Sequence, residues 1–99
     1  GWRRGLGNEG SVLIHGNRCP MVGRVCMDQF LVDVTSLEGV AEGDVATLIG
    51  SDGNNSISAS DVALAAGTIS WDVLASLQAR LPRFYHRAGA VEALAPPMW

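Results

Sequence analysis

Short apolar stretches separated by turn residues fill the first half of the chain, and their spacing predicts β-strands. We expect strands over residues 11–16, 19–27, 30–35 and 45–50. The dipeptide Gly16–Asn17 between the first two strands is typical of a hairpin turn. Pro20 lacks the N–H that a ladder needs, so we expect the second strand to start at a sheet edge. The pattern predicts a strand meander, with Asp33 facing solvent and a turn over residues 51–56.

The second half of the chain changes to the spacing of helices. Residues 58–67 predict a short helix with Ser60 as its N-cap. Residues 70–81 predict another helix, with Ser70 as its N-cap and Pro82 just beyond its end.

The second predicted helix should bury one apolar stripe, made of Val73, Leu74, Leu77 and Leu81. Two last strands are expected over residues 83–86 and 91–94, joined by a turn. The sum is a mainly β domain, a small β-barrel or sandwich that carries two short helices.

Composition indicates one small globular domain. The chain has 99 residues, 47% of them hydrophobic, and a net charge of −3. Its basic residues are scattered, which argues against a nucleic-acid partner. No apolar run approaches the roughly 18–20 residues that cross a bilayer, and no secretory leader opens the chain, so we expect a soluble domain without membrane contact.

Cys19 and Cys26 are too few for a disulfide framework. The simplest interpretation is two small buried thiols in a reducing, cytoplasmic compartment. A structural bridge between them is the alternative.

Apparent binding motifs fail when their context is considered. Gly5, Gly7 and Gly10 match G-x-G-x-x-G, but a strand rather than a helix follows, so no dinucleotide site is predicted. A calcium loop starting at Asp52 would have the wrong residues at its sharp turn and at its bidentate position. The histidines and cysteines lack the spacing of metal ligands, so we expect no metal. The residues alone predict no complete active site.

The stretch GRVCMDQF, Gly23–Phe30, interrupts an apolar run with an acid and an amide after Met27. A turn or bulge at the edge of the sheet accounts for this interruption. A backbone directed toward a ligand is the alternative.

Several sequence blocks, in the same order, resemble the C-terminal domain of the alanine racemase family. They are GWRR, PMVGRVCMDQFLVDVT, GDVATLIG, ISASDVALAAGTISWDVL and RLPRFY, and they cover nearly the whole chain. The block VGRVCMDQ is highly specific to that family. Because the chain starts with a Gly-rich stretch and without an initiator Met, we expect residues 1–99 to be a fragment that consists of this domain.

The resemblance implies a pyridoxal-phosphate enzyme that interconverts L- and D-alanine for peptidoglycan precursors. In this family an N-terminal (β/α)8 barrel holds the cofactor on a lysine, and the C-terminal domain completes the active site of the other subunit of a homodimer. The two bases are that lysine and a tyrosine, and both would lie upstream of Gly1. We therefore expect no catalytic residue in the fragment, which should be inactive alone.

The resemblance also implies a substrate contact at the interrupted strand. The backbone N–H of Met27 would bind the substrate carboxylate, because a fixed backbone donor needs little reorganisation when charge moves. Cys26 would line the same site, and Asp28 would orient neighbouring groups.

Other positions correspond to the surroundings of the family's site. Arg4, Arg24 and Ile69 would line the corridor by which substrate arrives between subunits. Trp71 stands where the family usually has a tyrosine that contacts the cofactor phosphate, and an indole offers a donor only, on a bulkier ring. This departure affects both the phosphate contact and the width of the pocket, whereas Tyr85 is expected to pack rather than to catalyse.

The expected substrate is alanine. A serine racemase or one of broad specificity, with or without a fused membrane module, is the alternative within the same class. A non-catalytic β-barrel interaction module is the alternative from another class.

Overall fold

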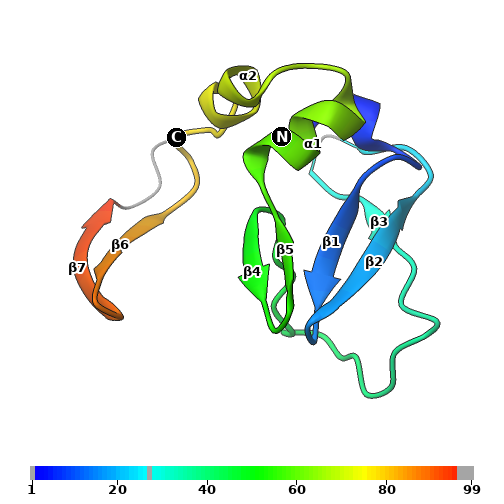
Figure 1. Cartoon of the computed structure of the whole chain (residues 1–99), viewed down its shortest axis with the longest axis horizontal. Coiled ribbons are helices and arrows are strands. Elements are labelled where there is room, and N and C mark those ends of the chain that lie inside the picture. Colours follow the sequence, from blue (N-terminus) through cyan, green and yellow to red (C-terminus); the bar gives the residue numbers. More distant parts are fainter. Residues whose placement is uncertain (1, 27, 96–99) are drawn as a thin grey trace.

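The computed structural model describes residues 2–26 and 28–95, apart from the side chain of Glu92. Its strands form three separate antiparallel sheets, and two short helices lie at one end of them (Figure 1). The elements are η1 (Arg4–Leu6), β1 (Ser11–Ile14), β2 (Asn17–Val22), β3 (Leu31–Val32), β4 (Gly50–Asp52), β5 (Asn55–Ile57), α1 (Ala59–Ala66), α2 (Ser70–Ala75), β6 (Arg83–Arg87) and β7 (Ala90–Ala95). The mainly β domain with two short helices is confirmed, and none of the described sheets closes into a barrel.

Strands β1 and β2 form the expected hairpin, with Ile14 paired to Asn17. The turn lies one residue earlier than predicted, because His15 and Gly16 are its central residues and Asn17 opens β2. His15 and Gly16 both have positive φ, 51° and 77° respectively. Such a pair matches the right-handed twist of the two strands, which explains the tight connection.

Strand β2 is the middle strand of the sheet β1-β2-β3, but its first residues, 17–20, pair only with β1, so the expectation that the strand starts at an edge is confirmed. Strand β3 pairs only with Met21 and Val22. Pro20 lies directly before these two residues, and its carbonyl accepts a hydrogen bond of 2.9 Å from the Asp33 N–H. The missing N–H of Pro20 is tolerated because ladder pairing with β3 stops there.

Both faces of β1 are covered, which explains its unbroken apolar sequence. Leu13 lies on one face, in a cluster with buried residues of η1, β2, the connection after β2, β5 and the two helices: Leu6, Met21, Val25, Ile57, Val62, Ala63 and Val73. Val12 and Ile14 lie on the other face with Cys19, and the loop over residues 30–48 covers them with Phe30, Val34, Leu37, Val40 and Leu48.

The strand expected over residues 45–50 is wrong. In this stretch Gly50 begins β4, and Thr47 forms an isolated bridge to Leu13 through backbone hydrogen bonds of 2.8 and 2.9 Å. Val45 is 77% exposed, whereas Leu48 and Ile49 pack against different core clusters, so the apolar residues there do not share one face. The turn expected over residues 51–56 is confirmed at Gly53 and Asn54, which connect β4 to β5, whereas the residues on either side belong to the two strands.

Helix α1 has Ser58, not Ser60, as its N-cap. The Ser58 Oγ accepts from the Asp61 N–H at 3.0 Å, and the Asp61 carboxylate accepts from the Ser58 N–H at 2.8 Å. This reciprocal pair is a capping box. The Ser58 N–H, and after it the Ser58 hydroxyl, hold the pKa of Asp61 below its usual value. Gly67 follows the helix with φ of 76° and ends it.

Helix α2 is shorter than predicted and ends at Ala75, with Ile69 rather than Ser70 as its N-cap. The Ser76 hydroxyl donates to the Val73 carbonyl at 2.7 Å, a bond that competes with the helical ladder. Of the predicted apolar stripe only Val73 is buried; the others, Leu74, Leu77 and Leu81, are exposed.

Strands β6 and β7 confirm the predicted terminal hairpin. They pair from Arg83 with Ala95 to Arg87 with Ala90. In Figure 1 this hairpin extends away from the other sheets, and every residue of β6 is exposed.

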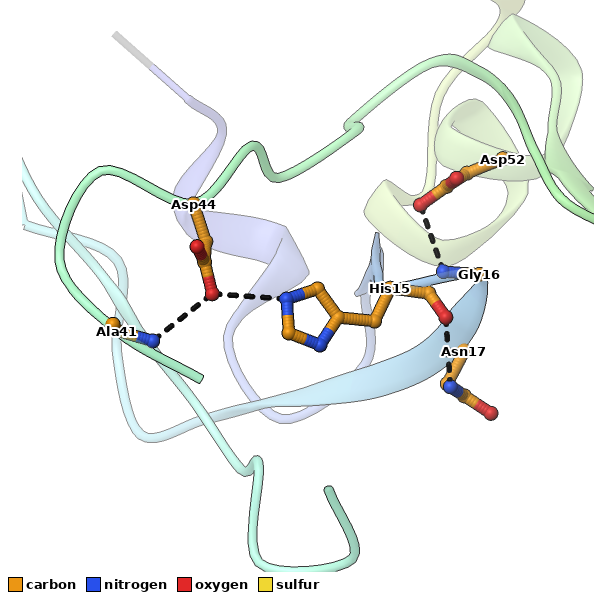
Figure 2. A network of polar contacts seen from close by, with 6 residues as sticks. All are labelled: His15, Gly16, Asn17, Ala41, Asp44 and Asp52. Atoms are coloured by element: carbon orange, nitrogen blue, oxygen red, sulfur yellow. Dashed lines mark hydrogen bonds and ion pairs between the residues drawn. The ribbon is translucent and has the colours of Figure 1, made fainter. Parts of the chain in front are cut away.

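A polar network ties the loop residues Ala41–Asp44 to the β1–β2 turn (Figure 2). The Asp44 Oδ2 accepts from the Ala41 N–H and lies 2.9 Å from His15 Nε2. The Gly16 N–H donates to Asp52 at 2.9 Å, which joins the same turn to β4. The Ala41 N–H, assisted by His15, holds the pKa of Asp44 below its usual value, against an opposing effect of desolvation.

Candidate functional site

The interruption of the apolar run is a turn between β2 and β3. Val25 is buried, and the Cys26 N–H donates to the Gln29 carbonyl at 2.9 Å. We use the name CMDQ turn for Cys26, Asp28 and Gln29, the described residues of this connection. Met27 lies outside the described residues, so its backbone bond to a substrate stays a prediction.

A pocket of about 400 Å³ separates the CMDQ turn from the chain that follows α2. Its polar lining residues are Cys26, Asp28, Gln29, Ser76, Gln78 and Arg80. Its apolar lining residues are Trp2, Phe30, Leu48, Leu77 and Leu81. This volume and mixture are typical of a small-molecule site.

An ion pair connects the two walls of the pocket. Arg80 Nη2 lies 3.1 Å from Asp28 Oδ1, and Arg80 Nε donates to Gln78 Oε1 at 3.1 Å. The side chains of Arg80 and Asp28 are 40% and 79% exposed, so the pair is accessible to solvent.

The two cysteines differ in their surroundings. Cys19 is buried between β1 and the loop that covers it, as predicted. Cys26 is exposed, so the prediction of a buried thiol is wrong there, because the chain leaves the sheet after Val22 and Cys26 lies in the connection to β3. Both thiols are free, which excludes the alternative of a bridge between them.

The residues expected along a substrate corridor are exposed but are not among those that line the pocket. Arg4 belongs to η1, Arg24 to the connection after β2, and Ile69 caps α2. Trp71 lies on α2 with 79% of its surface exposed, also outside the pocket lining. The structure therefore brings together Cys26 and Asp28 of the predicted set, and places the other described members elsewhere.

The start of α2 is held by an arginine that the sequence pattern did not single out. Arg3 Nη2 lies 2.6 Å from Asp72 Oδ1, and it donates to the Asp72 carbonyl at 3.3 Å. The Thr68 hydroxyl donates to the other carboxylate oxygen at 2.7 Å. These bonds fix the helix that carries Trp71 against the N-terminal segment.

The described residues, 2–26 and 28–95, contain no group of three His, Cys, Asp or Glu side chains that could hold a metal ion. No helix in the same part of the chain is long and apolar enough to cross a membrane. All seven basic residues of the chain are arginines, so it has no lysine amine that could bind a carbonyl cofactor covalently.

The model of the family described as alanine racemase, C-terminal domain, matches residues 1–85. The chain belongs to this family. The alanine racemases of Methanococcus maripaludis and Halothermothrix orenii are 49% and 45% identical to it over 85 residues, 86% of this chain. The chain spans only 22% of the length of each of these relatives.

Solved structures of alanine racemases have the same fold over this region. The enzyme from Bacillus anthracis, whose structure contains bound L-Ala-P, superimposes with a TM-score of 0.83 at 40% identity, over 92% of this chain and 23% of that one. The enzyme from E. faecalis gives a TM-score of 0.66 at 43% identity, over 73% of this chain and 19% of that one.

Within this alanine racemase domain, sequence reasoning missed the segment 76–81 that forms one wall of the pocket. The segment was expected to be helical, with Leu77 and Leu81 buried. Arg80 opens the block RLPRFY, so the resemblance drew attention to this position without indicating that it contacts Asp28.

Proposed function

We propose that the parent of this chain is a pyridoxal-phosphate racemase that interconverts L- and D-alanine. The domain would complete the active site of the other subunit in a cytoplasmic homodimer, and D-alanine would serve peptidoglycan precursors. Membership of the alanine racemase C-terminal domain family over residues 1–85 is the observation that carries this proposal.

The residues of this chain do not by themselves fit pyridoxal phosphate as a covalently held group. The chain has no lysine, and its single tyrosine, Tyr85, lies on the exposed β6–β7 hairpin. The proposal therefore assigns the cofactor and both bases to the remainder of the parent. Pyridoxal phosphate, when bound in the remainder of the parent, would supply the electron sink that makes the α-proton of the substrate acidic.

The contribution proposed for this domain is binding and orientation. The Met27 N–H would hold the substrate carboxylate, and its neighbours Cys26 and Asp28 both line the pocket, which supports a role for the turn. Arg4 and Arg24 are exposed, as a corridor for an anionic substrate group would require, and Ile69 would add an apolar wall.

Trp71 is proposed to approach the cofactor phosphate with its indole N–H, which its exposure on α2 leaves available to an outside group. Its larger ring, at a position where the family usually has tyrosine, changes the width of the site, so the second candidate is a racemase that accepts serine or other amino acids.

The test is to compare the full-length parent with the 99-residue domain. The loaded parent should produce D-alanine from L-alanine, and the domain alone should neither do so nor show a cofactor absorbance band. A parent that binds the cofactor but racemises only serine would favour the second candidate. A parent without any racemase activity would contradict the proposal and favour an interaction module.

A further inference from the structure

We infer that Arg80 is a positioning residue for the CMDQ turn, which it holds through Asp28 so that the turn faces the pocket. This inference rests on the proposed function, because it gives the turn a task in binding the substrate carboxylate. Arg80 lines the pocket, and the role inferred for it is to act through Asp28 rather than to bind substrate or cofactor.

The guanidinium of Arg80 is anchored on two sides. Nη2 contacts Asp28 Oδ1 at 3.1 Å, and Nε donates to Gln78 Oε1 at 3.1 Å. A planar guanidinium bonded at two edges has a defined orientation, unlike a single flexible ammonium group. Arg80 can therefore hold Asp28 at a fixed direction as well as at a fixed distance.

The segment that carries Arg80 is itself held in place. The Leu81 N–H donates to the Gln78 carbonyl at 3.1 Å, which closes a turn around Arg80. Arg83 Nη2 donates to the Leu77 carbonyl at 3.3 Å. The arginine thus projects from a hydrogen-bonded turn toward the opposite wall of the pocket.

Packing does not fix the Asp28 side chain, since 79% of it is exposed. The backbone bond from Cys26 to Gln29 is local to the CMDQ turn and does not attach it to another element. The Arg80 contact joins the turn to a segment 52 residues further along the chain. Loss of this contact should loosen the turn without exposing any buried group.

The expected effect is on binding rather than on folding. Exposed ion pairs contribute little to the free energy of unfolding. Removal of the Arg80–Asp28 pair should therefore leave the unfolding midpoint almost unchanged. A misplaced carboxylate donor should instead weaken the binding of the substrate carboxylate by about three- to tenfold.

The experiment uses the full-length racemase with Arg80→Gln, Asp28→Asn and both changes together. The KM for L-alanine and the inhibition constant of acetate, a probe of carboxylate binding, should each rise about three- to tenfold in both single variants, with kcat within about twofold of the parent. The double variant should be no worse than either single variant, because both changes break one contact. Arg80→Lys should recover part of the loss.

Arg18→Gln is the matched control, since Arg18 is an exposed arginine of β2 that donates to Ser11 and to the Ser56 carbonyl. It should leave KM and the acetate constant unchanged. Unchanged constants in Arg80→Gln, or additive losses in the double variant, would overturn the role of Arg80 in an active racemase. An inactive parent would instead contradict the proposed function.

Discussion

At the scale of single residues, two leucines of this chain differ greatly in how far their side chains are exposed to solvent. Leu13 is completely buried at the centre of the cluster between β1 and the helices, whereas Leu64 of α1 is 84% exposed. The cost of truncating a side chain depends on the contacts it loses and on the cavity it leaves. The two positions should therefore respond very differently to the same substitution.

We expect Leu13→Ala to lower the free energy of unfolding of the domain by about 2–5 kcal/mol. Leu64→Ala is the control and should change it by no more than about 0.5 kcal/mol. Urea unfolding followed by tryptophan fluorescence measures both values. Equal losses in the two variants would show that the described core does not carry the stability of the domain.

At the scale of elements, two carboxylates stabilise the ends of segments. Asp61 closes the capping box of α1, and Asp44 ties the loop 41–44 to the β1–β2 turn. In both cases backbone N–H groups donate to the ionised form, which is why both carboxyl pKa values are lowered. Each element end therefore depends on a charge as well as on a hydrogen bond.

The capping box predicts that replacing Ser58 and replacing Ser60, two serines at the same end of α1, will have different effects on stability. Ser58→Ala should destabilise the domain by about 1 kcal/mol, because the Asp61 N–H loses its acceptor. Ser60→Ala should be neutral or slightly stabilising, because Ser60 is an exposed residue inside α1 and alanine favours helix. Thermal unfolding of the two variants would decide between them, and a larger loss from Ser60→Ala would contradict the assignment of the cap.

The lowered pKa of Asp44 predicts an acid-sensitive loop anchor. A carboxyl whose pKa is lower in the folded state stabilises the fold above its ordinary pKa of about 3.9, and this contribution disappears as the pH falls through the lowered value. Asp44→Asn should therefore be less stable than the parent domain at pH 6, and the difference should shrink toward pH 2. Urea midpoints measured across this range test the prediction. A difference that stays constant with pH would refute the role of the charge.

At the scale of the whole molecule, apolar side chains remain on the outside. Trp71, Ile69 and Leu64 are 79%, 62% and 84% exposed on or beside the helices. The β6–β7 hairpin adds Phe84 and Leu94 at 57% and 55%. Patches of this kind usually mark contacts with other protein surfaces, and a two-stranded hairpin gains stability when it is covered.

We therefore expect the isolated 99-residue domain to remain folded but to self-associate as its concentration rises. Sedimentation velocity over a hundredfold range of concentration measures this association. Trp71→Gln should shift the distribution toward monomer, because it removes the largest exposed apolar side chain of α2. A strictly monomeric domain at high concentration would contradict the prediction.

The sequence by itself determined those features that depend on neighbouring residues. The hairpin at His15–Gly16 and the strands around the terminal turn follow from local turn chemistry and strand spacing. The cap of α1 can also be read from local sequence, because Ser58 and Asp61 have the spacing of a capping box, which the prediction of Ser60 overlooks. Family-specific blocks such as VGRVCMDQ were sufficient to indicate the family, since they are strings of adjacent residues.

Only the tertiary structure decided which apolar stretches find a surface to cover. The residues after Ala75 have helical spacing, yet α2 ends there and Leu77 and Leu81 line the pocket instead of a buried stripe. The stretch around Thr47 makes a single bridge instead of a strand. The pocket and the contact between Asp28 and Arg80 join residues 52 positions apart. Their proximity results from how the turn after β2 and the chain after α2 are placed by the packed core, and this placement depends on burial summed over the whole domain rather than on any local pattern.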